Sequence, residues 1–197
     1  MAYDYERIRV EHDAGVCFAT IDNPPINLIT PELFAELAAF SAEVEADEAV
    51  RALVLKSADP EFFLAHFDVE ALIDMPVDGP AERDPELNDY HLMCERFRTM
   101  DKVTICQIEG RVGGGGSELA LSCDMRFGVL GRTRICQMEV PLGILPGGTG
   151  TQRLPRLVGR ARALEIVLGG DDLDRAHGGG LGVSEPGPGG GRDRTLR

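Results

Sequence analysis

The chain has 197 residues, of which 43% are hydrophobic and 27% charged, and its net charge at pH 7 is −13. This length and composition are typical of a globular protein with one domain and a sizeable core. No apolar run approaches the roughly 20 residues of a membrane helix, and the N-terminus lacks the basic start and apolar stretch of a signal peptide. The acidic balance disfavours nucleic acid as a partner, because phosphate binding usually requires a basic patch. We therefore expect a cytoplasmic protein without membrane or nucleic-acid partners.

The cysteines and histidines form no pattern typical of a disulfide framework or a metal site. The five cysteines are odd in number, widely spread and never in a C-x-x-C pair, whereas disulfide frameworks and zinc sites use paired spacings. The four histidines show no H-E-x-x-H or similar spacing. We expect reduced, partly buried thiols and no metal.

The first third of the chain alternates between strand and helix patterns. Residues 5–22 alternate as two strands around the turn at Asp13-Ala14-Gly15, which predicts a hairpin. Thr30 is a typical helix cap and is followed by Pro31, which favours the first helical position, and then by apolar residues at helical spacing. The apolar run 51–56 predicts a strand buried on both faces.

The pattern continues along the middle of the chain. Helical stretches are predicted near residues 68–74 and 85–100, and a second apolar strand over 103–109 runs straight into glycines. Strands that alternate with helices at this spacing indicate an α/β fold.

The last residues differ in composition from the rest. From Arg175 to Arg197 the chain is rich in Gly, Pro and Arg and poor in apolar residues, so it cannot bury enough apolar surface to offset its ordering entropy. We interpret residues 1–174 as the folded core and 175–197 as a disordered tail. A natural flexible tail would explain this composition. A reading-frame shift near residue 174 would explain it too, because Gly, Arg and Pro dominate out-of-frame translation of GC-rich DNA.

The glycines at 113–116 lie between a predicted strand and a predicted helix. They allow close backbone approach and leave N–H groups free to point at a ligand. A P-loop is excluded because neither Lys56 nor Lys102 follows the required pattern, and the first strand–helix junction has no Rossmann glycine fingerprint. A glycine turn that only permits close strand–helix packing is the alternative.

Two carboxylates and one histidine near these segments could carry chemistry. Glu118 falls in the first turn of the helix predicted after the glycines, where it either complements the helix dipole or acts as a pocket carboxylate. Glu139 is flanked by apolar residues, which tend to raise the pKa of a carboxyl and so suit it to proton transfer. An ordinary solvated glutamate is the alternative for Glu139, and a surface or packing histidine is the alternative for His66.

Five segments follow one another in a fixed order along residues 5–174. They are N-P-P-I-N at 23–27, F-L-A-H-F-D-V at 63–69, E-G-R-V-G-G-G-G-S-E-L-A at 109–120, M-E-V-P-L-G-I-L-P-G-G-T-G-T-Q-R-L at 138–154 and R-A-R-A-L-E-I-V-L-G-G-D at 160–171. Together they resemble the motifs of the enoyl-CoA hydratase/isomerase, or crotonase, superfamily.

The resemblance implies a spiral of ββα turns that binds an acyl-CoA thioester. Coenzyme A is then part of the substrate, and no cofactor is implied. The thioester carbonyl would lie in an oxyanion hole formed by the backbone N–H groups of Phe67 and Gly115, which stabilise charge developing on its oxygen. Further substrate-binding positions implied by the resemblance are Ala65, His66, Asp68 and Gly114.

The resemblance also assigns roles to the two carboxylates. Glu118 would help to orient and deprotonate a water that attacks C3 of the acyl group, while Glu139 would deliver or withdraw the proton at C2. Because both carboxylates are present, we expect addition of water to a 2-enoyl-CoA. The alternatives are double-bond isomerisation or another enolate reaction, and a truncated, inactive homologue that binds CoA esters.

The chain departs from the family pattern within the core, at His66, Phe67, Glu70 and Glu109, and at its end. His66 stands where the family usually has Gly, and Glu70 where many hydratases have Lys. Family members continue after the position of residue 174 into C-terminal helices that cover the acyl pocket and support trimers. This chain has Gly/Pro/Arg sequence instead, so we expect the trimerisation helices to be missing. The homotrimer or hexamer that the resemblance implies would then lack the helices that support it.

Overall fold

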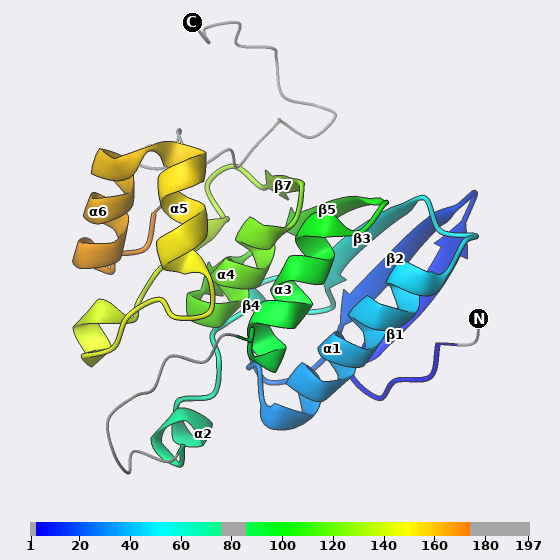
Figure 1. The fold of residues 1–197 in the computed structure, drawn as a ribbon, viewed down its shortest axis with the longest axis horizontal. Helices are drawn as coiled ribbons and strands as arrows, with labels where there is room; N and C mark the ends of the chain where they lie inside the picture. Colours follow the sequence, from blue (N-terminus) through cyan, green and yellow to red (C-terminus); the bar gives the residue numbers. More distant parts are fainter. Residues whose placement is uncertain (1–2, 76–85, 174–197) are drawn as a thin grey trace, which may run out of the picture.

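Two β-sheets, one mostly and one wholly parallel, and the helices that follow their strands make up the fold (Figure 1). The structure is a computed structural model that describes residues 3–75 and 86–173. The predicted α/β class is confirmed. The segment 175–197, interpreted as a tail, lies outside the described residues.

The larger sheet begins with the predicted hairpin and continues with parallel strands. Its strands, in spatial order, are β1 (Ile8–Asp13), β2 (Val16–Ile21), β3 (Ala52–Ser57), β5 (Val103–Ile108) and β7 (Met125–Gly128). Only the β1–β2 pair is antiparallel. The turn between them places Ala14 and Gly15 at φ values of 47° and 83°, in the left-handed region that glycine adopts at little cost.

The smaller sheet contains three parallel strands, β4 (Phe62–Leu64), β6 (Arg111–Gly113) and β8 (Arg134–Cys136). Each follows a strand of the larger sheet, so the pairs β3/β4, β5/β6 and β7/β8 each place one strand in each sheet. With the helices that come next, they form the ββα turns that the resemblance implies.

The strand predicted over 103–109 does not run straight into the glycines. It ends at Ile108, and the chain turns and forms β6 in the second sheet, which ends at Gly113, the first of these glycines. The turn requires a glycine, because a Cβ at Gly110 would lie 2.1 Å from the carbonyl oxygen of Glu61.

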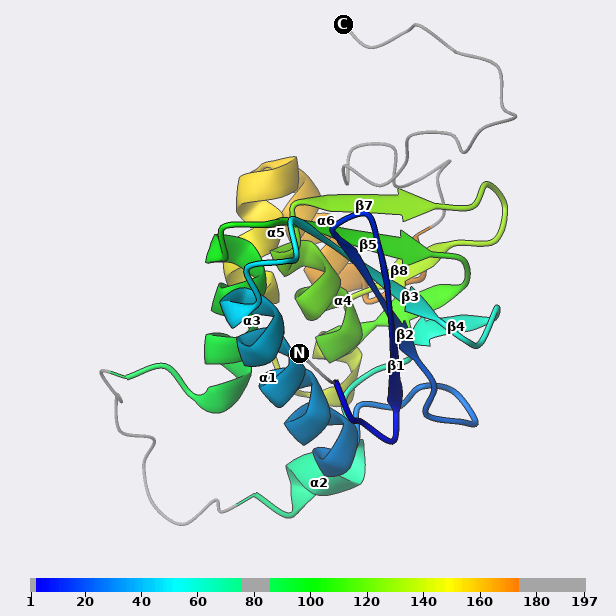
Figure 2. The ribbon, with the colours of Figure 1, turned by 90° about the vertical axis from the view of Figure 1, so that its right-hand side faces the viewer.

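Helices cover one face of the larger sheet and one end of the molecule. They are α1 (Pro31–Ala46), α2 (Val69–Ile73), α3 (Asp89–Thr99), α4 (Gly114–Ser122), the 3-10 turn η1 (Val140–Leu142), α5 (Gly150–Val158) and α6 (Arg160–Gly169). Figure 2 shows α1 and α3 side by side on one face of the sheet, and α5 and α6 pack together beyond β7 in Figure 1. None of these helices in the described ranges is long and apolar enough to cross a membrane.

The N-terminal caps determine where α1 and α3 begin. Thr30 caps α1 as predicted, because its hydroxyl accepts the N–H of Leu33 at 3.3 Å. The side chain of Asn88 accepts the N–H of His91 at 2.9 Å, so α3 begins at Asp89, later than the predicted residue 85.

The buried side chains form one main core between the larger sheet and α1, α3 and α4. The helix α1 contributes the apolar face predicted for it, made of Leu33, Leu37, Phe40 and Val44. All five cysteine side chains are buried as free thiols. This core fixes the ends of β4 and β6, which lead into the site.

Asn27 connects the loop after the hairpin to the smaller sheet. It is buried and has a φ of 52°. Its side-chain oxygen accepts the N–H of Asn23 at 2.7 Å, and its amide donates to the hydroxyl of Ser57 at 2.7 Å and the carbonyl of Phe63 at 3.3 Å. Its own carbonyl accepts the N–H of Ala65 at 3.3 Å. Asn27 therefore holds the start of the segment 65–68.

We predict that Asn27→Ala destabilises the fold by about 3 kcal/mol, because it removes several buried hydrogen bonds of about 1 kcal/mol each and leaves alanine in a left-handed conformation. Asn27→Gly loses the same hydrogen bonds but tolerates the backbone, so it should cost about 1 kcal/mol less. Equilibrium unfolding in urea measures both. Losses below about 0.5 kcal/mol for both variants would contradict this role.

Candidate active site

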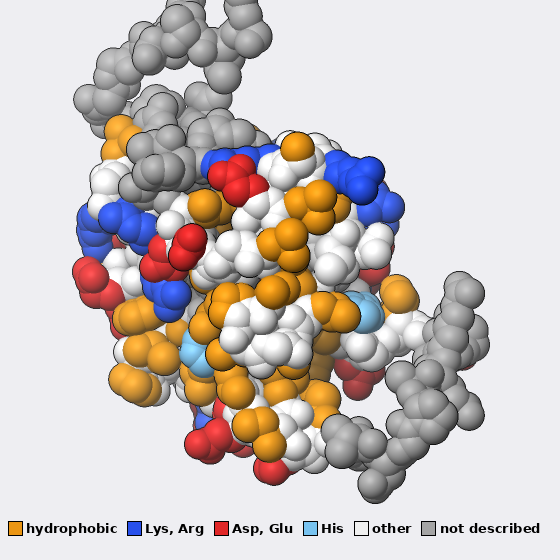
Figure 3. Space-filling view, turned by 90° about the vertical axis from the view of Figure 1, so that its left-hand side faces the viewer, with side chains coloured by type: hydrophobic (Ala, Val, Ile, Leu, Met, Phe, Trp, Pro, Cys, Tyr) orange, Lys and Arg blue, Asp and Glu red, His pale blue; other side chains and the backbone are white. Residues whose placement is uncertain are grey.

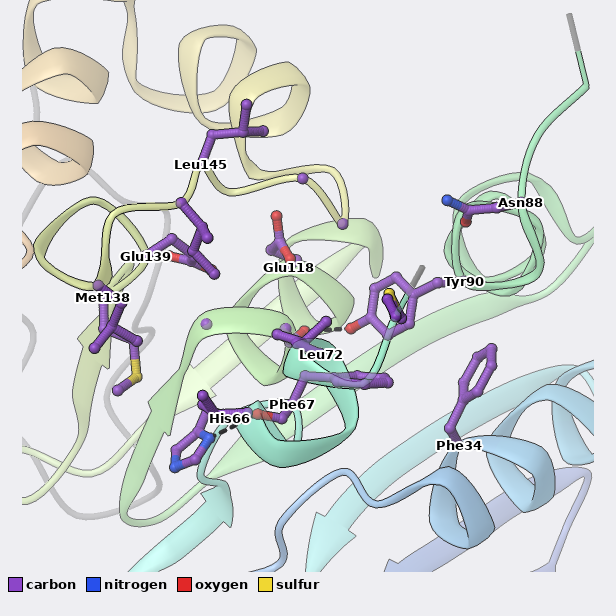
Figure 4. Close-up of a pocket in the computed structure, with 18 of the residues that line it drawn as sticks. Phe34, His66, Phe67, Leu72, Asn88, Tyr90, Glu118, Met138, Glu139 and Leu145 are labelled. Carbon is purple, nitrogen blue, oxygen red and sulfur yellow. Dashed lines mark hydrogen bonds between the residues drawn. The ribbon is translucent and has the colours of Figure 1, made fainter. Parts of the chain in front are cut away.

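A cavity of about 570 Å³ lies between α2, α3, the start of α4 and the segment 138–148 (Figure 4). Figure 3 shows the side of the molecule that lies at the left in Figure 1, where hydrophobic side chains gather mostly below the level of α5 and α6. Most side chains that line the cavity are apolar, including Phe34, Phe67, Val69, Leu72, Met75, Met138, Leu142, Ile144 and Leu145. The ionisable groups among its lining residues are His66, Asp89, Tyr90, His91, Glu118 and Glu139.

The glycines at the start of α4 are part of the helix rather than a loop before it. The helix begins at Gly114, so Glu118 lies in its second turn and the prediction that placed it in the first turn is wrong. Close packing explains the early start: a Cβ at Gly115 would lie 3.1 Å from the hydroxyl of Tyr90, and one at Gly116 would lie 2.6 Å from the carbonyl oxygen of Leu64. The glycines therefore serve close packing as well as leaving N–H groups at the cavity.

The two predicted oxyanion-hole residues, Phe67 and Gly115, both line this cavity. The segment around Phe67 pairs with Ile29, but this bridge uses the carbonyl of His66 at 2.9 Å and the N–H of Asp68 at 3.0 Å, not the N–H of Phe67. Gly115 is the second residue of α4, and the first four N–H groups of a helix have no partner within it. Both donors therefore remain candidates for binding an oxygen atom in the cavity.

Glu118 is buried, with 3% of its surface exposed, and its carboxyl group lies against the start of α5. One carboxyl oxygen, Oε1, accepts the N–H of Thr149 at 3.0 Å and that of Gly150 at 2.7 Å. Burial raises the pKa of Glu118, and these backbone N–H groups oppose that rise. A Cβ at Gly148 would lie 2.3 Å from the other carboxyl oxygen, so the turn 147–150 closes directly over the carboxyl group.

Glu139 lies just before η1 with 7% of its surface exposed. Its Oε2 is buried and has no hydrogen-bond partner among the described residues. Burial, and then the charge of Glu118, raise its pKa to about 7, which confirms the rise predicted from its apolar surroundings. The two carboxyl groups lie close together in Figure 4. Because the ionised form of each disfavours ionisation of the other, the two groups titrate as a coupled pair.

Tyr90 is a site residue that the sequence reasoning did not find. Its hydroxyl donates to the carbonyl of Gly115 at 2.6 Å, and burial raises its pKa well above the ordinary value, so the hydroxyl stays protonated. Its ring packs with those of Phe34 and Phe67, at centroid distances of 5.6 and 5.8 Å. The helical spacing over 85–100 predicted the helix but not which residues reach the glycines from it.

The other predicted binding residues divide into two groups. His66 and Gly114 line the cavity, and His66 donates from Nδ1 to the carbonyl of Phe67 at 2.8 Å. Ala65 and Asp68 are not among the lining residues: Ala65 is buried, and the side chain of Asp68 caps α2. Across the part of the chain that the structure describes, no group of three His, Cys, Asp or Glu residues could hold a metal ion.

We predict that Glu139→Gln gains stability relative to the parent as the pH rises. In the folded chain Glu139 has a pKa of about 7, whereas an unfolded glutamate has one of about 4.3. Between these values the folded state binds a proton that the unfolded state has lost, so the parent becomes less stable as pH rises, whereas glutamine does not titrate. Urea unfolding at pH 5 and pH 8 should show a relative gain of about 1–2 kcal/mol. A difference between parent and variant that is the same at both pH values, as expected for the exposed control Glu11→Gln, would contradict the raised pKa.

Most of the chain is similar in sequence to a known protein family and to curated proteins. A family model described as enoyl-CoA hydratase/isomerase matches residues 11–184, which reaches into the segment interpreted as a tail. The fatty acid oxidation complex subunit alpha of Shewanella baltica (strain OS185) is 35% identical over 164 residues, which is 82% of this chain and 23% of that protein. The chain therefore spans less than a quarter of the length of the curated relatives it matches.

Solved structures with the same fold include proteins described as enoyl-CoA hydratases. One, described as a candidate enoyl-CoA hydratase from Streptomyces avermitilis, is 36% identical with a TM-score of 0.81, over 93% of this chain and 69% of that chain. Another, from Geobacillus kaustophilus, is 27% identical with a TM-score of 0.79, over 91% of this chain and 67% of that chain. The fold, the motifs and the match over most of the sequence agree, and the chain belongs to the enoyl-CoA hydratase/isomerase family.

Proposed function

We propose that this chain adds water across the C2=C3 double bond of a 2-enoyl-CoA thioester. The observation that carries the proposal is the pair of buried carboxyl groups, Glu118 and Glu139, on one largely apolar cavity. One carboxyl is held by backbone N–H groups, which favour its ionised form, and the other has a pKa of about 7. Hydration needs both a base for water and an acid for carbon, and such a pair supplies both near neutral pH.

The thioester carbonyl oxygen would bind the N–H groups of Phe67 and Gly115. As water attacks C3, negative charge moves onto this oxygen, and fixed donors in an apolar cavity stabilise that charge more than the neutral carbonyl. The positive end of the α4 dipole acts in the same direction. The bond from Tyr90 to the carbonyl of Gly115 would keep this part of the helix in place.

Glu118 and Glu139 would divide the proton transfers. Ionised Glu118 takes a proton from the water as its oxygen bonds to C3, and the electrons of the double bond move into the enolate. Protonated Glu139 then donates its proton to C2, so the product gains one hydroxyl group and one hydrogen. The pair ends with as many protons as it began with, and exchange with solvent restores their original positions.

The acyl chain would occupy the apolar part of the cavity. Solvent-exposed Met75, Leu142, Ile144 and Leu145 line it, with 47–63% of their surfaces exposed. Covering these side chains removes apolar surface from water, which favours binding by about 25 cal/mol per Å². A chain of aliphatic carbons suits this lining better than a polar acyl group.

We predict that the purified chain removes the ultraviolet absorbance of the conjugated thioester of a short 2-enoyl-CoA. Glu118→Gln and Glu139→Gln should each lower the rate by about 100-fold or more, the usual effect of losing a general acid or base. The exposed control Glu11→Gln should leave it unchanged. A folded parent that leaves the absorbance unchanged would overturn the proposed hydration of that substrate.

A double-bond isomerisation is the second candidate, and the unpaired Oε2 of Glu139 favours it, because one free carboxyl oxygen can both remove and return a proton. Product analysis in deuterated water separates the two. Hydration gives a hydroxyl at C3 with deuterium at C2, whereas isomerisation moves the double bond and adds no oxygen. If neither product forms, the result supports the third possibility, a homologue that only binds CoA esters.

A further inference from the structure

His91 reaches from α3 to the loop that precedes α5. Its backbone is fixed at the third position of α3, where its N–H donates to the side chain of Asn88 at 2.9 Å. Its ring nitrogen Nε2 lies 2.6 Å from the carbonyl oxygen of Gly147. Because a carbonyl can only accept, Nε2 carries the proton in this contact.

The residue that His91 contacts begins the turn that binds Glu118. After Gly147, the N–H groups of Thr149 and Gly150 both donate to Oε1 of Glu118. Thr149 has a φ of 147°, a costly conformation for a β-branched residue that persists only where surrounding contacts hold it. Its hydroxyl also donates to the backbone carbonyl of Glu118 at 3.3 Å.

A second contact from the same helix face holds the other end of this segment. Glu95, four residues after His91 and therefore on the same face of α3, forms an ion pair with Arg153 in the first turn of α5. The Arg153 side chain is 13% exposed. Residues 147–153 are thus attached to α3 at both ends, with the Glu118 contacts between them.

We propose that His91 is a positioning residue of the site, which holds the turn 147–150 on the carboxyl group of Glu118 through its bond to Gly147. Its effect on catalysis rests on the proposed function, whereas its effect on the turn does not. Sequence reasoning gave His91 no role, because its helical spacing does not distinguish it from a surface histidine.

The test compares His91→Leu, which cannot donate to Gly147, with His91→Gln, whose side-chain amide can replace the Nε2–H donor. Hydrogen exchange of the Thr149 and Gly150 amides, measured by NMR, reports the turn without any substrate. We expect exchange at least about tenfold faster in His91→Leu and close to the parent in His91→Gln. The same substitutions at His12, exposed on β1, are the matched controls.

Turnover of a short 2-enoyl-CoA then tests the catalytic consequence. His91→Leu should lower kcat about tenfold with little change in KM, and His91→Gln should recover most of it. Unchanged amide exchange in His91→Leu would overturn the proposal, and so would an equal loss of kcat in both variants. If the parent does not hydrate the substrate, the proposed function fails, while the exchange data still decide the positioning role.

Discussion

The burial of the Glu118 carboxyl group is the constraint on which the site depends. A buried carboxylate is costly unless hydrogen bonds compensate it, and here the N–H groups of Thr149 and Gly150 offset part of that cost. Glycines make this possible, because a Cβ at Gly148 or Gly150 would collide with the carboxyl oxygens at 2.3 and 3.0 Å. The start of α5 is therefore shaped around one side chain of α4.

The same burial determines the protonation of the second carboxyl. Burial among apolar side chains, and then the charge of Glu118, raise the pKa of Glu139 to about 7. The two carboxyl groups thus have different environments: one has two fixed donors, and the other has an oxygen without a partner among the described residues. This difference supports the assignment of a base and an acid to the pair.

Much of this arrangement could be predicted from the sequence. The hairpin, the start of α1 and the raised pKa of Glu139 follow from local pattern, caps and apolar neighbours. The strand β6 was missed because it has three residues and its partners are far away in sequence. The first turn of α4 was missed because glycine disfavours helices, and only packing against Leu64 and Tyr90 makes glycine necessary there. Periodicity likewise could not show that Tyr90 and His91 point toward the site, since it reveals only the helix.

Burial and the neighbouring charge of Glu118 raise the pKa of Glu139 to about 7, and the proposed division between base and acid depends on this rise. Carbon-13 NMR of glutamate-labelled protein, with Glu118→Gln and Glu139→Gln used to assign the two signals, follows each carboxyl directly as pH changes. We expect the Glu139 signal to titrate near pH 7, and at lower pH in Glu118→Gln, where the neighbouring charge is gone. Titration of both groups near pH 4.3, the value of a solvated glutamate, would contradict it.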